Sequence, residues 1–196
     1  MDDVGDIILI RHGQTEWSAN GRHTSYTDLP LTPDGEREAE ALRPGLAGRR
    51  IGAVLSSPLR RARRTAELAG LTVTETSDDL AEWNYGAYEG ITSKQIHEGR
   101  PDWSLWRDGC PEGESPEQVG ARMDRALARA RELAAGDDDV VLVGHGHSLR
   151  VCGARWIGLD ASHGAGLLLS TATVSALGFE HHLPAIVLWN APVGAA

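Results

Sequence analysis

Features that mark several classes of protein are scarce or absent in this sequence. Its 196 residues include only two cysteines, Cys110 and Cys152, which are too few for a disulfide framework. No apolar run approaches the length of a membrane span. The acidic start at residues 1–3 is followed by an apolar run too short for a signal peptide. We therefore expect no membrane partner and a reducing, cytoplasmic setting.

Positive charge and nucleotide-binding motifs are also lacking. The formal net charge is -9, and Lys94 is the only lysine. Proteins that neutralise nucleic-acid phosphates carry an excess of positive charge, so we expect no nucleic-acid partner. The sequence holds neither a glycine-rich Walker loop nor a dinucleotide-binding fingerprint. Ser148 lies outside any Gly-x-Ser-x-Gly elbow, which argues against a serine hydrolase.

What the sequence does have is an alternation of strand-like and helix-like segments. Apolar or β-branched runs predict strands at residues 7–10, 51–56, 71–76 and 140–143. Apolar residues at helical spacing predict helices at residues 33–46, 59–69, 93–98, 116–134 and 149–157. Runs at 172–179 and 185–189, split by residues 181–184, predict an antiparallel hairpin at or near a sheet edge.

This order of elements predicts the fold class. Strands that alternate with helices are typical of a mostly parallel sheet. We expect residues 1–196 to form a single α/β domain, a three-layer sandwich with helices on both faces of the sheet and an antiparallel strand near one edge. A polar loop at residues 14–31 and a connection rich in Trp, Gly and Pro at 101–116 are the expected specificity segments, because loops this long are usually functional.

Three of the predicted strands end in residues that carry chemistry. Arg11 and His12 follow the first, a group of arginines follows Ser57 after the second, and His145 follows the strand at 140–143. In open parallel sheets the carboxyl ends of the strands meet at one edge, where ligands bind. Histidine can form a covalent intermediate, and arginine matches phosphate oxygens with a planar fork. The set therefore favours a phosphorylated substrate.

Four short motifs, taken together, extend this interpretation to a family. They are Arg11-His12-Gly13, Ser57-Pro58-Leu59-Arg60-Arg61-Ala62, Glu82 ahead of Tyr85-Gly86, and Gly144-His145-Gly146. In order and spacing, over residues 5 to about 157, they resemble the histidine phosphatase superfamily, the phosphoglycerate-mutase-like family.

The resemblance implies a role for each matching residue. His12 would be the nucleophile that becomes phosphohistidine, His145 the second pocket histidine, and Glu82 the general acid and base. The implied phosphate-binding residues are Arg11, Arg61, Ser18 and Gly146. Thr24, Ser25 and His147 would influence substrate specificity, although a hydrogen bond at the helix start accounts equally well for His147. Neither a metal nor a cofactor is implied.

Two alternatives stay open at the level of single residues. Arg60 replaces Arg61 as the second phosphate clamp if the helix register is shifted by one. Glu89 competes with Glu82 as the proton-transferring carboxylate. His163, His181 and His182 lie outside the motifs and are expected to be solvated.

Two features favour hydrolysis over phosphoryl transfer to a second alcohol. Only about 33 residues separate Glu82 from the predicted helix at 116–134, and residues 192–196 form a plain tail. The stretches at residues 82–90 and 106–115 resemble the short phosphatase branch of the family, which includes acid phosphatases and sedoheptulose-1,7-bisphosphatase-like enzymes. We expect a phosphatase acting on a small phosphomonoester, such as a sugar phosphate or a phosphoglycerate-like compound. The alternatives are a cofactor-dependent phosphoglycerate mutase and, from another class, a non-catalytic phospho-ligand binding module. Whether the chain forms a homodimer is open.

Overall fold

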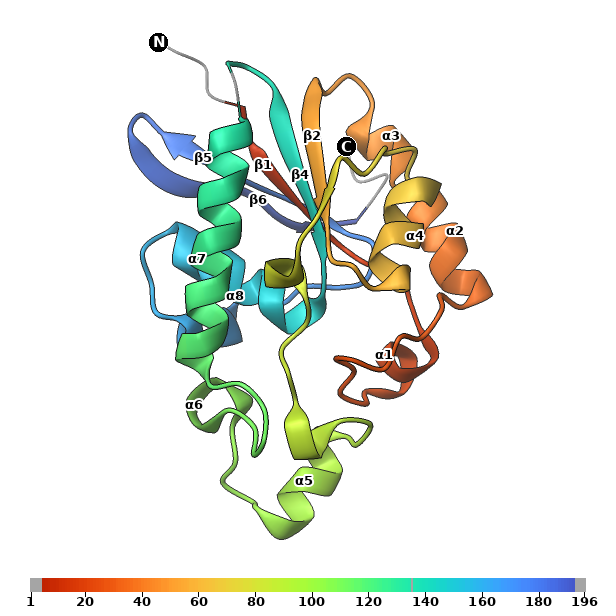
Figure 1. The fold of residues 1–196 in the computed structure, drawn as a ribbon, viewed down its shortest axis with the longest axis vertical. Helices are drawn as coiled ribbons and strands as arrows, with labels where there is room; N and C mark the ends of the chain where they lie inside the picture. The colour runs from red at the N-terminus through yellow and green to blue at the C-terminus, as the bar shows by residue number, and fades with distance from the viewer. Residues whose placement is uncertain (1–4, 135, 193–196) are drawn as a thin grey trace.

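A six-stranded sheet runs through the middle of the molecule (Figure 1). The structure is a computed structural model that describes residues 5–134 and 136–192, so residues 1–3 and most of the predicted plain tail lie outside the described residues. The strand order is β3-β2-β4-β1-β5-β6. The strands are β1 (Ile7–Arg11), β2 (Ile51–Ser56), β3 (Glu75–Thr76), β4 (Asp139–Gly144), β5 (Val174–Glu180) and β6 (Leu183–Ala191).

The pairing confirms a mostly parallel sheet with an antiparallel hairpin at one edge. β1, β4, β2 and β3 pair in parallel, whereas β5 runs antiparallel to β1 and β6 antiparallel to β5. The turn of the hairpin is tighter than predicted. Leu183 and Pro184 already pair with Glu180 and Phe179, so only residues 181–182 form the turn, with His181 at a φ of 57°.

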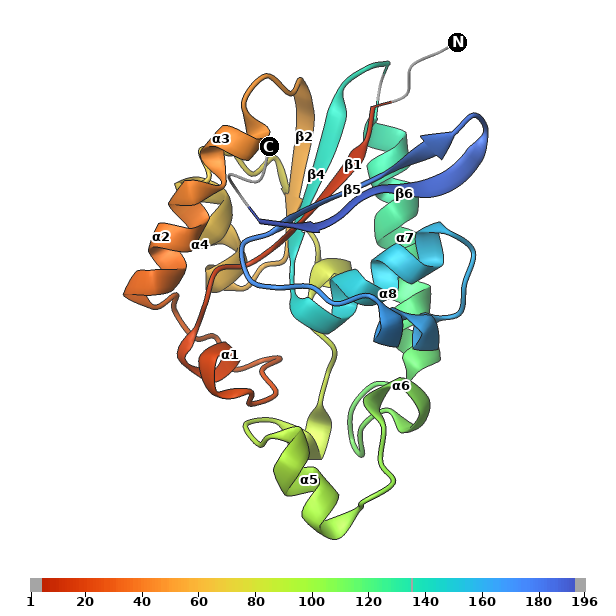
Figure 2. The ribbon, with the colours of Figure 1, turned by 180° about the vertical axis from the view of Figure 1, so that it is seen from behind.

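Helices cover both faces of the sheet, as the three-layer prediction requires (Figures 1 and 2). One face carries α7 (Pro116–Leu133) and α8 (Gly146–Trp156), and the other carries α2 (Pro33–Ala41), α3 (Arg43–Leu46) and α4 (Arg60–Leu68). Side chains of a strand alternate between faces. Accordingly, Ile7 and Leu9 of β1 lie in the core under α7 and α8, while Ile8 and Ile10 lie in the core under α2 to α4.

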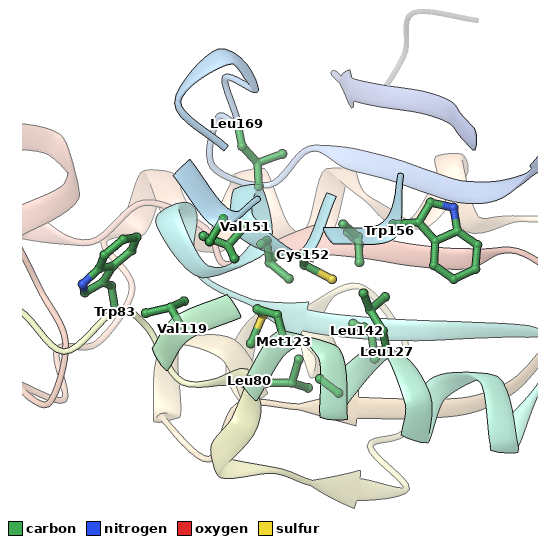
Figure 3. Close-up of a cluster of buried hydrophobic side chains, with 14 of the residues drawn as sticks. Leu80, Trp83, Val119, Met123, Leu127, Leu142, Val151, Cys152, Trp156 and Leu169 are labelled. Carbon is green, nitrogen blue, oxygen red and sulfur yellow. The ribbon is translucent and has the colours of Figure 1, made fainter. Parts of the chain in front are cut away.

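The larger core fixes the start of α8 at the end of β4 (Figure 3). Val119, Met123 and Leu127 recur every four residues along α7 and form one apolar face. This face packs with Leu142 of β4 and with Cys152 of α8. The packing holds the first turn of α8 against the edge of the sheet where the parallel strands end.

Three predicted elements differ from the structure. The single helix predicted at 33–46 is divided at Leu42 into α2 and α3, with Pro44 in the first turn of α3. The strand predicted at 71–76 pairs only at Glu75 and Thr76. The hydroxyl of Thr74 accepts the hydrogen bond of the Val54 N–H at 3.0 Å, so a side chain takes the place of a strand carbonyl there. The helix predicted at 149–157 begins three residues earlier, at Gly146.

The segment predicted as a loop at 14–31 contains a short helix, α1 (Glu16–Asn20). Thr15 and Ser18 form a reciprocal capping box at its start, and Gly21, at a φ of 74°, ends it in the left-handed conformation. α1 lies below the carboxyl ends of the parallel strands, together with α5 (Ser93–Gly99) and α6 (Leu105–Asp108) from the connection before α7 (Figure 1). Further 3₁₀ turns cover Asp78–Leu80, Gly86–Tyr88 and Ala161–Gly166.

Candidate active site

The residues that follow β1, β2 and β4 meet at one edge of the sheet. Arg11 of β1 pairs with Gly144 of β4, and Ser56 of β2 pairs with Val143 of β4. The next residues are therefore neighbours, and the ring centroids of His12 and His145 lie 5.1 Å apart. Motifs more than 130 residues apart in the sequence thus share one site.

His12 is buried, and one of its ring nitrogens forms a hydrogen bond with the backbone. Nδ1 lies 2.7 Å from the carbonyl oxygen of Gly13. A carbonyl oxygen only accepts, so Nδ1 carries the ring proton and Nε2 keeps its lone pair. Burial, followed by the positive charges of Arg61 and Arg11, lowers the pKa of His12 well below its usual range. The ring is therefore neutral near neutral pH, which is the state a nucleophile needs.

His145 has the opposite arrangement of its ring proton. The Nε–H of Arg61 donates to its Nδ1 at 3.2 Å, so Nε2 carries the proton. Nε2 lies 2.8 Å from the hydroxyl of Ser57 and donates to it. Burial, then the charge of Arg61, lowers the pKa of His145 well below its usual range. His145 is therefore a neutral hydrogen-bond donor beside His12.

Helix α4 turns one of its first two arginines inward. Arg61 is fully buried, whereas Arg60 is exposed. The guanidinium of Arg61 donates to the carbonyl oxygens of Thr24, Ser25 and Thr27. These bonds hold the segment after α1 against the site, and they leave the cation without a carboxylate partner among the described residues.

Arg11 lies against the first residue of α8. Its Nη1 donates to the carbonyl oxygen of Leu169, while its Nε is buried and has no hydrogen-bond partner within the described ranges. A Cβ built at Gly146 would come within 3.2 Å of the Arg11 guanidinium carbon. The glycine therefore gives the arginine room to approach the helix start.

Glu82 is bound to the first turn of α8. Its carboxylate accepts the backbone N–H groups of Trp83 at 2.8 Å, His147 at 3.1 Å and Ser148 at 2.9 Å. Unpaired N–H groups at a helix start carry partial positive charge and favour a carboxylate there. Glu82 is consequently held at the same edge of the sheet as His12 and His145.

Arg122 of α7 fixes the backbone that leads to Glu82. Its guanidinium donates to the carbonyl oxygens of Asp79, Ala81 and Glu82 and pairs with the carboxylate of Glu114 at 2.7 Å. The sequence alone does not single out Arg122 among the arginines of α7, because the carbonyl groups that it binds lie about 40 residues earlier in the chain.

Glu89, the competing carboxylate, has other partners. It accepts the backbone N–H groups of Ser25 and Thr27 and, at 2.6 Å, the hydroxyl of Ser25. Ser25, expected as a specificity residue, therefore does not line the cavity beside His12, because its hydroxyl is used to anchor its own segment to Glu89.

A cavity of about 190 Å³ opens beside His12. Among the residues predicted for the site, those that line it are Arg11, His12, Ser18, Thr24, Glu82, Gly146 and His147. Arg61 and His145 are fully buried and do not line its surface. The predicted residues thus divide into a group that faces the cavity and a buried group that contacts His12 or its neighbours.

Eight further lining residues were not predicted for the site, and four of them carry a charged, imidazole or phenol side chain: Arg22, His23, Tyr85 and Arg150. The Tyr85 hydroxyl lies 2.6 Å from Nδ1 of His147, and Nδ1 of His23 donates to the carbonyl oxygen of Ile91 at 2.8 Å. Tyr85 belongs to the motif in which Glu82 precedes Tyr85-Gly86, so its place in the cavity could have been predicted from the sequence. Nothing in the sequence distinguishes His23 from the solvated histidines.

Neither a metal-binding cluster nor a membrane-spanning helix is found in the part of the chain that the structure describes. Within residues 5–134 and 136–192, no group of three or more His, Cys, Asp or Glu side chains is arranged to hold a metal ion. None of the helices in these ranges is long and apolar enough to cross a membrane.

Comparison with known proteins places the chain in a family. The model of the histidine phosphatase superfamily (branch 1) matches residues 7–192. The chain is 46% identical over 182 residues to an acid phosphatase of Mycobacterium tuberculosis, covering 89% of this chain and 87% of that protein. It is 39% identical over 184 residues to sedoheptulose 1,7-bisphosphatase of Saccharomyces cerevisiae, covering 78% and 67%. A solved structure of an open reading frame product from Mycobacterium tuberculosis superposes with a TM-score of 0.91 at 42% identity, covering 96% of this chain and 98% of that one. The chain therefore belongs to branch 1 of the histidine phosphatase superfamily and is a phosphatase.

Proposed function

We propose that this phosphatase hydrolyses small phosphorylated metabolites, sugar phosphates first among them, through a phosphohistidine on His12. The observation that carries the proposal is the state of His12. Nδ1 of the ring is hydrogen-bonded to Gly13, and Nε2 has no hydrogen-bond partner among the described residues. Burial together with two nearby arginines lowers the pKa of His12, which keeps the ring neutral.

In the first step, Nε2 of His12 attacks the phosphorus and the ester P–O bond breaks. The substrate, bound as its monoanion, gives its proton to the carboxylate of Glu82, and the leaving alkoxide then takes this proton from the Glu82 carboxyl group. Arg11, which lines the cavity, would contact the phosphoryl oxygens, and the buried cation of Arg61 would stabilise the developing negative charge from behind His145. His145 turns its Nε2–H from Ser57 to a phosphoryl oxygen, and the Arg61 bond to its Nδ1 supports this role.

In the second step, water attacks the phosphohistidine. Glu82, now a carboxylate, takes a proton from the water as the new P–O bond forms, and the P–N bond to His12 breaks. Inorganic phosphate then leaves with the proton that Glu82 gained from the water, so His12 returns to the free neutral ring and Glu82 to the carboxylate. The same carboxyl group therefore acts as the general acid in the first step and as the general base in the second.

The remaining predicted residues have supporting roles. Ser18 and Gly146 line the cavity, Gly146 next to Arg11, and would contact the phosphoryl group. Thr24 and His147 also line the cavity and would contact the organic part of the substrate. Ser25 would act indirectly, by holding the segment whose carbonyl groups bind Arg61.

A screen of phosphorylated metabolites, with free phosphate as the readout, tests the proposal. The wild-type chain should release phosphate, and His12→Ala should reduce the release to background because no phosphoenzyme can form. His163→Ala, a substitution of an exposed histidine outside the site, is the matched control. Full activity in His12→Ala would overturn the proposed nucleophile.

Two finer expectations from the sequence stay predictions. We propose that the enzyme acts in the cytoplasm and that a homodimer is compatible with function. Light scattering on the purified protein measures the mass in solution, and fractionation of cells measures the compartment.

A further inference from the structure

The peptide group between Gly13 and Gln14 is hydrogen-bonded at both of its ends. Its carbonyl oxygen, which belongs to Gly13, accepts the Nδ1–H of His12 at 2.7 Å. Its N–H, which belongs to Gln14, donates to the Oε2 atom of Glu38 at 2.9 Å. One amide group therefore connects the imidazole ring of His12 to a carboxylate on α2.

The carboxylate of Glu38 is not used in an ion pair. Over residues 5–134 and 136–192, no arginine, lysine or histidine nitrogen lies within 4.0 Å of its oxygens. Glu36 of the same helix, by contrast, pairs with Arg64. The negative charge of Glu38 is therefore directed at the N–H of Gln14 without a neighbouring cation to neutralise it.

Other contacts hold the same peptide group in place without any charge. The hydroxyl of Thr65 accepts the N–H of Gly13 at 3.0 Å, and the N–H of Thr32 donates to the carbonyl oxygen of Gln14 at 2.9 Å. The backbone on each side of the peptide group is thus anchored to α4 and to the start of α2. A carboxylate is more than this anchoring requires, because a neutral oxygen at position 38 would satisfy the N–H equally well.

A negative charge at the N–H end of an amide makes its carbonyl oxygen a stronger acceptor, because hydrogen bonds that run in a chain polarise one another. A stronger acceptor holds the Nδ1 proton of His12 more firmly and raises the electron density at Nε2, as a carboxylate does when it lies directly behind a functional histidine. The effect partly offsets burial and the positive charges of Arg61 and Arg11, which lower the pKa of His12.

We propose that Glu38 is a positioning residue for the reaction: through the peptide group between Gly13 and Gln14, its carboxylate fixes the Nδ1 proton of His12 and strengthens Nε2 as the nucleophile. This role rests on the proposed function, since it requires His12 to attack phosphorus. Glu38 does not line the cavity beside His12. Its charge therefore acts on the ring through an amide and stays out of contact with the anionic substrate, which a carboxylate beside the ring would repel.

Proton and nitrogen NMR of the free enzyme tests this connection without any turnover. Glu38→Gln keeps a carbonyl oxygen opposite the Gln14 N–H but removes the charge. We expect the signal of the His12 Nδ1–H proton to move upfield, because its hydrogen bond to Gly13 weakens, while the ring keeps its tautomer. Glu40→Gln, in the same helix at an exposed position, is the matched control and should leave the signal unchanged.

Single-turnover kinetics with p-nitrophenyl phosphate tests the effect on the two chemical steps. A weaker nucleophile attacks phosphorus more slowly, but the same ring is a better leaving group when water attacks the phosphohistidine. Glu38→Gln should therefore slow the formation of phosphohistidine by about tenfold, the lower end of what removal of the partner behind a metal-bound histidine costs. Hydrolysis of the phosphohistidine should stay the same or become faster. A merely structural role would slow both steps together.

Inhibition by inorganic phosphate separates an effect on His12 from an effect on Arg11. Burial lowers the pKa of Arg11, and negative charges that include Glu38 oppose this. If Glu38 acted through Arg11, its replacement by Gln would change the affinity for phosphate. We expect the inhibition constant to change little. Tighter inhibition together with an unchanged rate of phosphohistidine formation would assign the charge to Arg11 and overturn the proposal.

The other outcomes distinguish this role from the proposed function. An unchanged Nδ1–H signal in Glu38→Gln, or equal slowing of both chemical steps, would reduce Glu38 to an anchor of the backbone and leave the phosphatase chemistry intact. Absence of phosphohistidine in the wild-type enzyme during turnover would overturn the proposed function, and the role of Glu38 in the reaction with it.

Discussion

The Nε–H of Arg61 donates to Nδ1 of His145 across 3.2 Å, and this hydrogen bond decides which ring nitrogen of His145 carries the proton. With Nδ1 occupied as an acceptor, Nε2 is the donor and lies 2.8 Å from Ser57. Arg61 therefore has two tasks. It supplies positive charge beside His12, and it sets the tautomer of the second histidine.

Arg61→Gln should therefore lower kcat/KM by more than the removal of one positive charge alone would, because it also removes the hydrogen bond that sets the tautomer of His145. Removal of a single preorganised donor at a site of developing negative charge costs about 10²–10³-fold in kcat, and we expect a loss at least this large. Arg60→Gln, one residue earlier and exposed, should leave the rate unchanged. Initial rates of phosphate release measure both, with circular dichroism as the check on folding. Similar losses in the two variants would contradict the assignment of Arg61.

The choice between Arg60 and Arg61 shows how much of the site can be predicted from the sequence. The helical spacing of Leu59, Ala62 and Ala66 predicts the helix, but the sequence separates Arg61 from Arg60 only through the family resemblance. In the structure the reason is physical. Arg61 precedes Thr65 by one turn, and Thr65, fully buried, contacts Gly13 through its hydroxyl. Arg61 thus lies on the face of α4 that meets the end of β1.

The residues that were not predicted depend on contacts between distant segments. Arg122 binds carbonyl groups about 40 residues away, and the partners of Arg150 belong to the segment after α8. Neither arginine sits in a local pattern that differs from its exposed neighbours. The strand predicted at 71–76 is shorter in the structure for a similar reason. The Thr74 N–H still donates to the Val54 carbonyl oxygen, but the Val54 N–H donates to the hydroxyl of Thr74 instead of to a backbone carbonyl. Local periodicity predicts elements, whereas these contacts depend on the tertiary arrangement.

Acid should destabilise the folded protein in a defined pH range. Burial lowers the pKa of four histidines, His12, His23, His145 and His147. Below about pH 6.5 the unfolded chain protonates these rings while the folded chain keeps them neutral. The unfolded state then binds more protons, so the free energy of unfolding falls as the pH falls from 6.5 toward the lowered values, by up to about 1.4 kcal/mol per pH unit for each ring.

Calorimetry between pH 7.5 and 5 (a range of roughly one to two units around the histidine pKa) measures this effect as a decreasing Tm. His147→Gln removes one of the four rings and should show a shallower decrease. His163→Gln, at an exposed position, is the control and should follow the wild-type curve. A Tm that stays constant or rises on acidification would contradict the prediction.

The reaction should not depend on a metal ion. The proposed site consists of arginine, histidine and one glutamate, which together supply the nucleophile, the charge stabilisation and the proton transfer. Phosphate release after dialysis against excess chelator should equal that of the untreated enzyme. A loss of activity that magnesium or zinc restores would show that a step is missing from the proposed chemistry.

The rate of hydrolysis should exceed the rate at which the phosphoryl group is transferred from one position of the substrate to another. With 3-phosphoglycerate, the phosphohistidine can meet water, giving inorganic phosphate, or an alcohol, giving 2-phosphoglycerate. The ratio of these two products, followed by NMR of phosphorus, measures the partition. Isomerisation that exceeds phosphate release by a wide margin would favour the phosphoglycerate mutase alternative.

Glu82→Gln should slow the enzyme to an extent that depends on the leaving group. The amide keeps the size of the side chain but can neither give nor take a proton. Help of this kind is worth about 10²–10⁴-fold, and a sugar alkoxide needs it far more than p-nitrophenolate does. Sugar-phosphate hydrolysis should therefore fall steeply, while the first step with p-nitrophenyl phosphate falls much less.

A rapid-quench measurement separates the two steps in this variant. If attack by water has become slow, p-nitrophenolate appears in a burst equal in amount to the enzyme. The reason is that each active site releases one p-nitrophenolate quickly, and its phosphohistidine is then hydrolysed slowly. Glu89→Gln is the matched control, since Glu89 binds Ser25 and Thr27 instead of the first turn of α8. It should not change the dependence on the leaving group. Equal losses on both substrates in Glu82→Gln, without a burst, would move the proton-transfer role away from Glu82 and make Glu89 the next residue to test.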